Sequence, residues 1–401
     1  MFYFKLGLRN IIRNFRKTML TMATLTIGMA AILLYNGSNA YVFGQFSENL
    51  IRSEYGHFQI YKSGYLANVD DHPYDHLIEG YREISGELMK IPGVKFVAPR
   101  LSFSGLIASD NTSTTIYGQA GNPRQENKFW HNTISNGSFI SSDDPEGILA
   151  GKGLVRRLSG ELGDTFTIMA TMKGKGLNGI DVKLKGVIDL GEADARNKMY
   201  GLVNLDRAQH LLGVGQSVDR LLVMLDNTAK MQKVEPEIRE ICSNNGLEYR
   251  RWDELAVVFK GIRDMFKMNE YILCGIIISI LTFIIANTMS MNLLERMREI
   301  GTIRALGTNR KRVMYIFLAE SSLIGLIGSF AGIILGLLLA LCINLTGGIY
   351  HGPSGYHTFI APQLQGILIY MLVFILDAAV SALMTARRAS RMYIAETLRY
   401  I

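Results

Sequence analysis

The chain has 401 residues, of which 48% are hydrophobic and 19% charged, and its net charge is +7 with a pI near 9.1. A basic protein of this kind can bind nucleic acid. Here, however, the segment 44–270 is slightly acidic, with 27 basic and 30 acidic residues. The excess positive charge lies around long apolar segments instead. We interpret it as a sign of membrane topology and of attraction to anionic lipid head groups, and we expect no nucleic-acid partner.

Four apolar segments are long enough to cross a bilayer, which takes about 20 largely uncharged residues. They predict transmembrane helices at 18–43, 271–294, 313–345 and 364–385, the uncharged part of the third starting at Ser321. Lys and Arg gather in 1–17, 295–312 and 386–401, whereas the loop 346–363 has no charged residue. The positive-inside rule then places both termini and the loop 295–312 in the cytoplasm, and 44–270 outside.

The first apolar segment has two features of a cleaved signal peptide, a basic flank and the small-residue sequence Ser38-Asn39-Ala40. Its length exceeds the usual ~7–15 apolar residues of such a signal, so we predict a retained span. In the segment 1–17 before it, apolar and basic residues fall on opposite faces at helical spacing. This pattern predicts an interfacial helix on the inner leaflet.

The segment 44–270 is predicted to form one compact α/β domain between the first and second spans. Alternating apolar residues indicate strands at Gly56–Tyr61, Val94–Pro99, Gly105–Ile107, Thr114–Tyr117, Thr165–Met169, Val182–Ile188 and Arg220–Leu225. Helical periodicity appears at Leu77–Lys90, Leu205–Leu212 and Met231–Asn244. The predicted fold is therefore a four-helix membrane protein with a large α/β extracytoplasmic domain.

Cysteine usage adds little to this interpretation. Cys242 is the one external cysteine, since Cys274 and Cys342 lie in spans, so no intrachain disulfide can form in the external domain. We interpret Cys242 as a buried apolar residue on the helix Met231–Asn244 rather than as a reactive thiol.

Signals for catalysis, nucleotides or metals are weak. An acidic loop holds His72 and His76 among aspartates, and we interpret it as solvated rather than metal-binding; the aspartates are Asp70, Asp71 and Asp75. The sequence GILAGKG at 147–153 lacks the spacing of a phosphate-binding loop. We therefore predict a chain that is not an enzyme and has no cofactor or metal of its own.

Two features stand out within the spans. Glycines recur at intervals of three or four residues in the third span, which predicts a strip where another helix packs closely; they are Gly325, Gly328, Gly332 and Gly336. The intramembrane acids are Glu320 and Asp377. Because a charge inside the bilayer is costly, we predict that each finds a hydrogen-bond or ion-pair partner, in preference to a role in proton relay.

The middle loop carries a family resemblance. The sequences ERMREIG at 295–301, RALG at 304–307 and FLAE at 317–320 resemble the FtsX-like permease domain of ABC transporters. The tail 387–399 is similar to the closing motif of that domain, although Ile394 stands where members often have proline. The segments 151–164 and 203–213 resemble the MacB-like periplasmic core domain, and GHFQI at 56–60 favours the LolC/LolE branch.

The resemblance implies a type VII permease that works by mechanotransmission. A separate ATPase dimer would bind ATP and Mg, dock on the cytoplasmic coupling helix 295–312, and move the first two spans. Met297, Ile300 and Leu306 would form an apolar anchor among charges of both signs. The residues assigned to coupling are Glu295, Met297, Arg298, Glu299, Ile300, Gly301, Arg304, Ala305, Leu306 and Gly307. The alternative is a basic loop that only lies on the membrane.

Three functions in the inner membrane fit this resemblance. In the first, the chain and a second permease copy or paralogue extract lipoproteins and pass them to a periplasmic carrier. Their cavity would be lined by Leu34, Val42, Phe46, Phe266, Met268 and Ile272. In the second, a MacB-like pump expels periplasmic substrates through an adaptor. In the third, an FtsX-like subunit activates a cell-wall hydrolase. The large external domain disfavours the third, and the sequence at 56–60 favours the first.

Overall fold

The computed structural model describes residues 9, 13, 15–109, 112–130, 134–174, 176–189, 195–306, 308–351 and 356–391. The chain divides into two compact units. We call residues 1–46 and 261–401 the helical unit, and residues 47–260 the α/β unit. Most of the predicted interfacial helix and the last ten residues lie outside the described residues.

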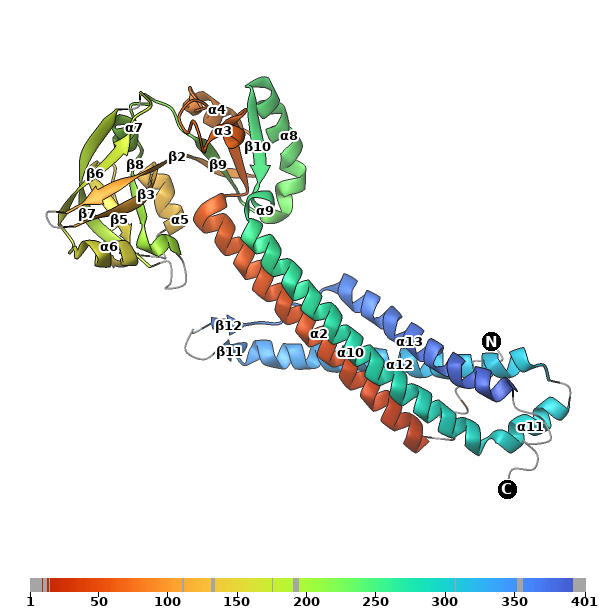
Figure 1. Cartoon of the computed structure of the whole chain (residues 1–401). Helices are drawn as coiled ribbons and strands as arrows, with labels where there is room; N and C mark the ends of the chain where they lie inside the picture. The colour runs from red at the N-terminus through yellow and green to blue at the C-terminus, as the bar shows by residue number, and fades with distance from the viewer. Residues whose placement is uncertain are drawn as a thin grey trace. The chain divides into compact units, whose positions relative to one another are not determined.

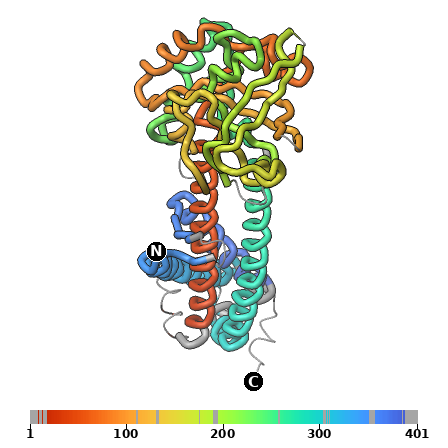
Figure 2. Tube along the Cα trace, turned by 90° about the vertical axis from the view of Figure 1, so that its left-hand side faces the viewer, coloured from red at the N-terminus to blue at the C-terminus, as the bar shows by residue number. Residues whose placement is uncertain are grey.

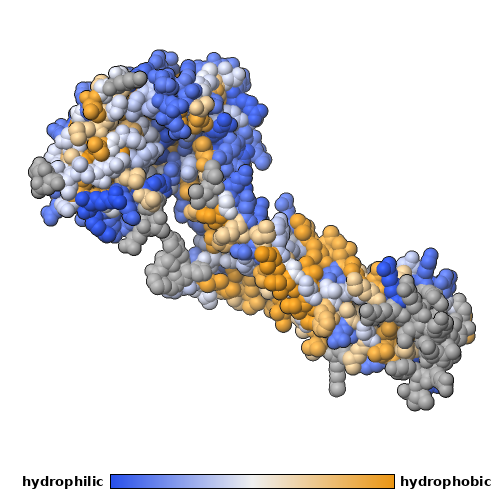
Figure 3. Space-filling model, in the orientation of Figure 1, coloured by the Kyte–Doolittle hydropathy of each residue, from blue (hydrophilic) through white to orange (hydrophobic). Residues whose placement is uncertain are grey.

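The helical unit is built from long apolar helices joined by short connections (Figure 1). These are α2 (Phe15–Leu50), α10 (Val257–Glu295), α11 (Met297–Ala305), α12 (Arg310–Leu345) and α13 (Leu364–Arg391), with a hairpin of β11 (Ile349–His351) and β12 (Tyr356–Thr358). Among the described residues, four helices are long and apolar enough to cross a membrane. They confirm the predicted number of candidate spans, and apolar side chains cover much of their visible surface (Figure 3).

The helices α2 and α10 run antiparallel and side by side (Figures 1 and 2). Thr21 Oγ1 lies 3.0 Å from Thr288 Oγ1 near one end of the pair. At the other end, the rings of Phe43 and Phe266 meet edge to face with centroids 5.1 Å apart. Both helices extend well past the predicted ends of their spans. The predicted domain boundary 44–270 was therefore too wide, since the α/β unit comprises 47–260.

The helical unit is held together by an apolar core to which all four long helices contribute. Its centre includes Leu25 and Met29 of α2, Ile285 of α10, Ile324 of α12 and Phe374 of α13, all fully buried. Burying a side chain of this size contributes about 1.5–3 kcal/mol. Inside a membrane, however, separated helices are already surrounded by apolar lipid. Close packing between the helices, rather than transfer from water, therefore stabilises the assembled bundle.

The α/β unit consists of one extended strand network with helices on its faces (Figure 1). Its strands are β1 (Phe58–Lys62), β2 (Val94–Ala108), β3 (Ser113–Gly121), β4 (Ile134–Gly137), β5 (Gly147–Gly151), β6 (Thr165–Thr171), β7 (Leu177–Ile188), β8 (Tyr200–Asn204), β9 (Arg220–Leu225) and β10 (Leu247–Arg251). Its helices are η1 (Ile51–Tyr55), α3 (Tyr65–Asn68), α4 (Tyr81–Leu88), α5 (Pro123–Trp130), α6 (Lys152–Leu158), η3 (Ala195–Lys198), α7 (Leu205–Leu212), η4 (Thr228–Lys230), α8 (Met231–Asn244) and α9 (Trp252–Leu255).

Strand β2 belongs to two different layers. Its first half pairs with β9, which continues through β1 to β10 as an antiparallel sheet, and α4 and α8 contact this sheet. Its second half joins a ring in which β2, β3, β8, β5, β7 and β6 pair in turn and β6 returns to β2. The described strands therefore form a small closed barrel attached to an open sheet.

Most predicted elements of this unit are present, but two strand predictions need correction. Val94–Pro99 and Gly105–Ile107 are parts of the single strand β2. The prediction ended the first strand before Arg100, because a charged residue interrupts the apolar pattern. In the structure this side chain is buried and the strand continues through it. The prediction also missed β4, β5, β8 and β10. In β5 and β8 all residues are buried, so neither strand has the polar-apolar alternation that marks a half-buried strand.

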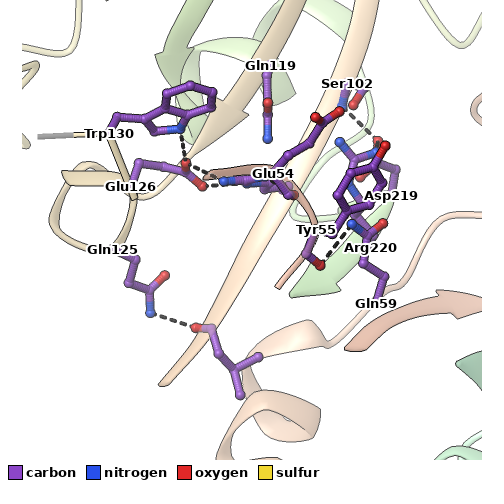
Figure 4. A network of polar contacts seen from close by, with 12 residues as sticks. Glu54, Tyr55, Gln59, Ser102, Gln119, Gln125, Glu126, Trp130, Asp219 and Arg220 are labelled. Atoms are coloured by element: carbon purple, nitrogen blue, oxygen red, sulfur yellow. Dashed lines mark hydrogen bonds and ion pairs between the residues drawn. The ribbon is translucent and has the colours of Figure 1, made fainter. Parts of the chain in front are cut away.

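Arg100 is tolerated in the core because every part of its guanidinium has a partner. Figure 4 shows Glu54, Glu126 and Trp130 of this network. Its Nε and Nη2 donate to the two carboxylate oxygens of Glu126 at 2.8 and 2.9 Å, and both side chains are fully buried. Its Nη1 donates to the carbonyl oxygen of Glu54 at 2.7 Å. Trp130 Nε1 also donates to Glu126, at 3.1 Å. Since breaking such a pair costs about 3–5 kcal/mol, the network fixes β2, α5 and η1 to one another.

A second buried polar group, His57, lies just after η1. It is 3% exposed, and its Nδ1 accepts the Leu225 main-chain N–H at 3.1 Å. The proton of the neutral ring must therefore sit on Nε2, which lies 3.1 Å from Thr228 Oγ1. Thr228 in turn donates to Glu48 Oε1 at 2.6 Å. Both ring nitrogens of the neutral imidazole thus have a hydrogen-bond partner.

This arrangement makes the α/β unit sensitive to acid. Burial lowers the pKa of His57 from 6.5 to about 4. Between pH ~6.5 and about 4, the unfolded chain binds a proton at His57 that the folded unit does not bind. The free energy of unfolding that His57 contributes above pH ~6.5 is therefore lost as the pH falls through this range. We expect His57→Asn, which keeps an acceptor for Leu225, to reduce this loss. Both tryptophans of the chain, Trp130 and Trp252, lie in this unit. Their fluorescence in thermal melts of the whole protein measures the effect, and an unchanged pH dependence would contradict it.

Candidate functional site

The predicted coupling segment forms a separate short helix. The helix α10 ends at Glu295, and α11 runs over Met297–Ala305 after a turn at Arg296, before α12 begins at Arg310. The predicted single helix 295–312 is therefore wrong in its bounds, and the third long helix begins three residues earlier than predicted. Side chains of Arg304 and Ala305, and all of Gly307, lie outside what the structure describes.

One face of α11 packs on the helical unit. Met297 is 3% exposed, Gly301 is buried, and Ile300 is partly buried against the apolar core. Met297 and Ile300 therefore cannot serve as the exposed apolar anchor that the sequence suggested, because the bundle already covers them. Leu306 is 83% exposed and is the part of that anchor available to a partner.

Ion pairs connect α11 and the turn before it to neighbouring segments. Arg296 Nη1 lies 3.4 Å from Glu320 Oε2 of α12, and the Glu320 side chain is buried. Arg296 also approaches Glu299 at 3.3 Å, and Arg13 donates to both oxygens of Glu299 at 2.9 and 3.0 Å. These contacts lower the pKa of the Glu299 carboxyl, chiefly through the hydrogen bond from Arg13. Arg13 ahead of α2, the end of α10 and the helix α12 are thus linked around one short helix.

The outward face of α11 carries exposed side chains. Arg298 and Glu299 are exposed, as is Glu295 at the end of α10. Glu299 is engaged by Arg13, whereas Arg298 is exposed near the start of the helix and Leu306 is exposed just after its end. A partner that contacts α11 therefore meets a basic side chain and an apolar one on an element whose other face is fixed to three helices.

The glycine strip of α12 forms a close contact with its neighbours. A Cβ atom at Gly332 would lie 2.6 Å from Met29 Cβ and 2.7 Å from the Thr26 carbonyl oxygen of α2. Gly328 and Gly336 face Leu25 and Ala30 of α2 in the same way, while Gly325 faces Ala378 of α13. Thr26 Oγ1 also donates to the Gly328 carbonyl at 3.2 Å. The glycines thus allow α2 to lie against the backbone of α12.

The intramembrane acids have partners of the predicted kind. Asp377 accepts a hydrogen bond from Thr282 Oγ1 of α10 at 2.5 Å, and Glu320 pairs with Arg296. Sequence reasoning missed a third acid, Glu270 of α10, because it sits one residue before the predicted span. Glu270 accepts from Asn36 of α2 at 2.7 Å and from the Tyr370 hydroxyl of α13. Three long helices therefore meet at Glu270.

The residues assigned to a substrate cavity lie near this junction on α2 and α10. Val42, Met268 and Ile272 are 38%, 59% and 53% exposed. The others, Leu34, Phe46 and Phe266, are partly buried, and Phe266 packs on Phe43. We call the exposed Val42, Met268 and Ile272 the apolar edge of α2 and α10.

The remaining candidates do not form a catalytic site. Among the described residues, no group of three or more His, Cys, Asp or Glu side chains is placed to hold a metal ion. In the acidic loop, His72 Nδ1 lies 3.7 Å from Asp75, and both are exposed. Cys242 is 2% exposed within α8, and burial raises the pKa of its thiol to about 12. The segment 147–153 forms β5 and the start of α6.

Comparison with protein families agrees with this architecture. Residues 18–241 match the MacB-like periplasmic core domain, and residues 271–394 match the FtsX-like permease C-terminal domain. The first match alone covers more than half of the chain. The chain belongs to this family of ABC transporter permeases. The permease is accordingly a multi-pass membrane protein and a transport component, and members of this class are not themselves catalytic.

Several curated proteins are similar to the permease. It is 21% identical to the lipoprotein-releasing system transmembrane protein LolC of Neisseria meningitidis, over 96% of this chain and 94% of that protein. It is 22% identical to LolE of the same system from Haemophilus influenzae, over 67% and 65% of the two chains. It is also 22% identical to the pyoverdine export ATP-binding/permease protein PvdT of Pseudomonas syringae, over 80% of this chain and 49% of that protein.

Proposed function

We propose that the permease couples ATP hydrolysis by a separate ATPase dimer to lipoprotein extraction from the inner membrane. The observation that carries the coupling step is the position of α11. Met297 on its inner face is buried in the helical unit, and the turn at Arg296 joins it to α12 through Glu320. On its outward face, Glu299 pairs with Arg13 of the N-terminal segment. Its exposed Arg298 and Leu306 remain available to a cytoplasmic ATPase that holds ATP and Mg.

In this proposal, closure of the ATPase dimer pushes α11, and the helices carry the displacement. Because α11 is joined to several helices by ion pairs, a push on it moves α10 and α12 together. The helix α2 follows because its backbone lies against the glycine strip. Both termini and α11 are then cytoplasmic, the α/β unit is periplasmic, and a second permease copy or paralogue completes the transporter.

Lipoprotein is the proposed substrate for two reasons. The similarity to LolC extends over nearly the whole of both chains, whereas the similarity to PvdT covers about half of that protein. The exposed apolar edge of α2 and α10 is also suited to acyl chains, since each buried methylene contributes about 0.8 kcal/mol. Export of a periplasmic substrate through an adaptor is the second candidate, and the similarity to PvdT favours it. Signalling to a cell-wall hydrolase has no comparable observation in its support.

A photo-crosslinker placed at Val42 or Ile272 tests the substrate. Both side chains are exposed on the apolar edge, at 38% and 53%. We expect each to capture a lipoprotein in cells. Leu368 of α13 is 58% exposed and serves as the control position, where we expect lipid adducts instead. Equal lipoprotein capture at all three positions, or capture of small soluble cargo within the α/β unit, would contradict extraction.

A further inference from the structure

The α/β unit contains a cleft of about 870 Å³ to which the proposed transport function assigns no role. It lies where two strands diverge along one edge of β2. On that edge, β9 pairs with Val94–Arg100 and β6 pairs with Gly105–Ala108. Between them, Leu101–Ser104 pair with β3 on the opposite edge but with neither β9 nor β6. The described strands thus leave a four-residue gap in the ladder, and Ser102, Phe103 and Ser104 line the cleft there.

The gap presents main-chain hydrogen-bonding groups to the cleft. In an antiparallel pair, alternate residues direct their N–H and C=O groups to the same edge. The Ser102 N–H points to the edge that β9 and β6 leave, where it donates to Asp219 Oδ2 at 2.8 Å and is therefore already paired (Figure 4). The main chain of Ser104 therefore faces the same edge. A strand edge of this kind is a template for another extended chain.

The lining of the cleft combines aromatic and acidic side chains. Four tyrosines line it, and two of them, Tyr61 and Tyr65, stack with ring centroids 5.5 Å apart; the others are Tyr74 and Tyr117. The acidic loop contributes the exposed carboxylates of Asp70, Asp71 and Asp75.

The other charges at the cleft are largely balanced. Asp219 and Arg220 lie beneath the gap and pair with each other at 3.1 Å, with side chains 1% and 15% exposed. Lys173 is the remaining lining residue with a full positive charge. The accessible charge of the cleft is therefore negative on the side of the loop, and tyrosine faces add to the attraction for a cation.

We propose that this cleft binds an extended, basic segment of another polypeptide. Three or four residues of the segment would add to β2 between β9 and β6, so that their main chain completes the ladder. A Lys or Arg side chain of the segment would lie between the tyrosine rings and the acidic loop. A peptide fits better than a ligand without a peptide backbone, because the main chain of Ser104 and the carbonyl of Ser102 face the cleft at strand spacing, although the Ser102 N–H is already bound by Asp219. This site goes beyond the proposed transport function and does not depend on the identity of the cargo.

The test uses the full permease in nanodiscs of zwitterionic lipid, which excludes attraction to anionic head groups. The probe is the fluorescein-labelled hexapeptide Thr-Lys-Val-Lys-Val-Thr, and binding is followed by fluorescence anisotropy. One comparison peptide has Glu in place of both Lys residues, and another is N-methylated at its four internal amides. We expect saturable binding of the first peptide only, because the second reverses the charge and the third cannot donate to the strand edge.

Two matched pairs of substitutions locate the binding. Asp70→Asn with Asp71→Asn removes two exposed carboxylates from the cleft, and we expect roughly three- to tenfold weaker binding. Glu237→Gln with Glu240→Gln removes two exposed carboxylates from α8, away from the cleft, and should leave binding unchanged. Absence of saturable binding, equal affinity for the three peptides, or an equal loss in both variants would overturn the proposal.

Discussion

Replacing Gly332 with leucine is expected to force α12 away from α2 and to destabilise the helical unit strongly. Even a Cβ atom at this position would lie 2.6 Å from Met29 Cβ and 2.7 Å from a main-chain oxygen of Thr26. The oxygen belongs to the backbone of α2, so it cannot move without displacing the helix. Overpacking in a well-packed interior costs about 1–3 kcal/mol, and here the leucine side chain adds three further carbon atoms beyond Cβ.

The effect can be measured as the temperature at which the detergent-solubilised permease loses its monodisperse peak in size-exclusion chromatography. Gly275→Leu is the matched control, because it places the same side chain in an apolar helix where a Cβ atom would meet nothing within 4 Å. We expect a clear fall for Gly332→Leu and little change for Gly275→Leu. Equal behaviour of the two variants would mean that the strip does not hold α2 and α12 together.

The double substitution Arg298→Glu and Leu306→Asp is expected to abolish co-purification of the ATPase. Both residues are exposed, and Leu306 is 83% exposed, so the changes remove the charge and the apolar contact that α11 offers to a partner. The ion pairs of Arg296 and Glu299, which fix α11 to the helices, are left intact. Arginine is enriched among the few interface residues that account for most of a binding energy.

The conservative pair Arg298→Lys and Leu306→Met serves as the control, because it keeps the charge and the apolar surface. We expect this variant to retain the ATPase. Both variants should insert into the membrane and melt like the parent, since neither touches the bundle core. Retention of the ATPase by the Glu/Asp variant would show that docking occurs elsewhere.

Much of the fold follows from local patterns in the sequence. The bounds of α7, α8 and β9 agree with the predicted Leu205–Leu212, Met231–Asn244 and Arg220–Leu225. In these elements the apolar periodicity continues close to the last residue and then ends. The four spans were predictable for a similar reason, since length and lack of charge suffice.

Other features depend on contacts between distant residues and could not be predicted. The continuity of β2 requires Arg100 to be buried, and that depends on Glu126 and on the main chain of Glu54. The cleft arises because β9 and β6 leave the same edge of β2, which is a property of strand order rather than of any one segment.

The candidate coupling site was also predictable only in part. The mixture of charged and apolar residues in 295–306 predicts a helix with two faces, but not which face the protein itself covers. That choice depends on the turn at Arg296 and its contact with Glu320, 24 residues further along the chain. It places Met297 inside and leaves Leu306 outside.

Reconstituted release of a lipoprotein tests the account most directly. The permease, its ATPase and a fluorescent lipoprotein are incorporated into liposomes, and lipoprotein transferred to a soluble carrier is measured with and without ATP. The account predicts ATP-dependent release that is lost with Arg298→Glu and Leu306→Asp and kept with Arg298→Lys and Leu306→Met. ATP hydrolysis without release by the parent complex, or release that persists in the Glu/Asp variant, would contradict it.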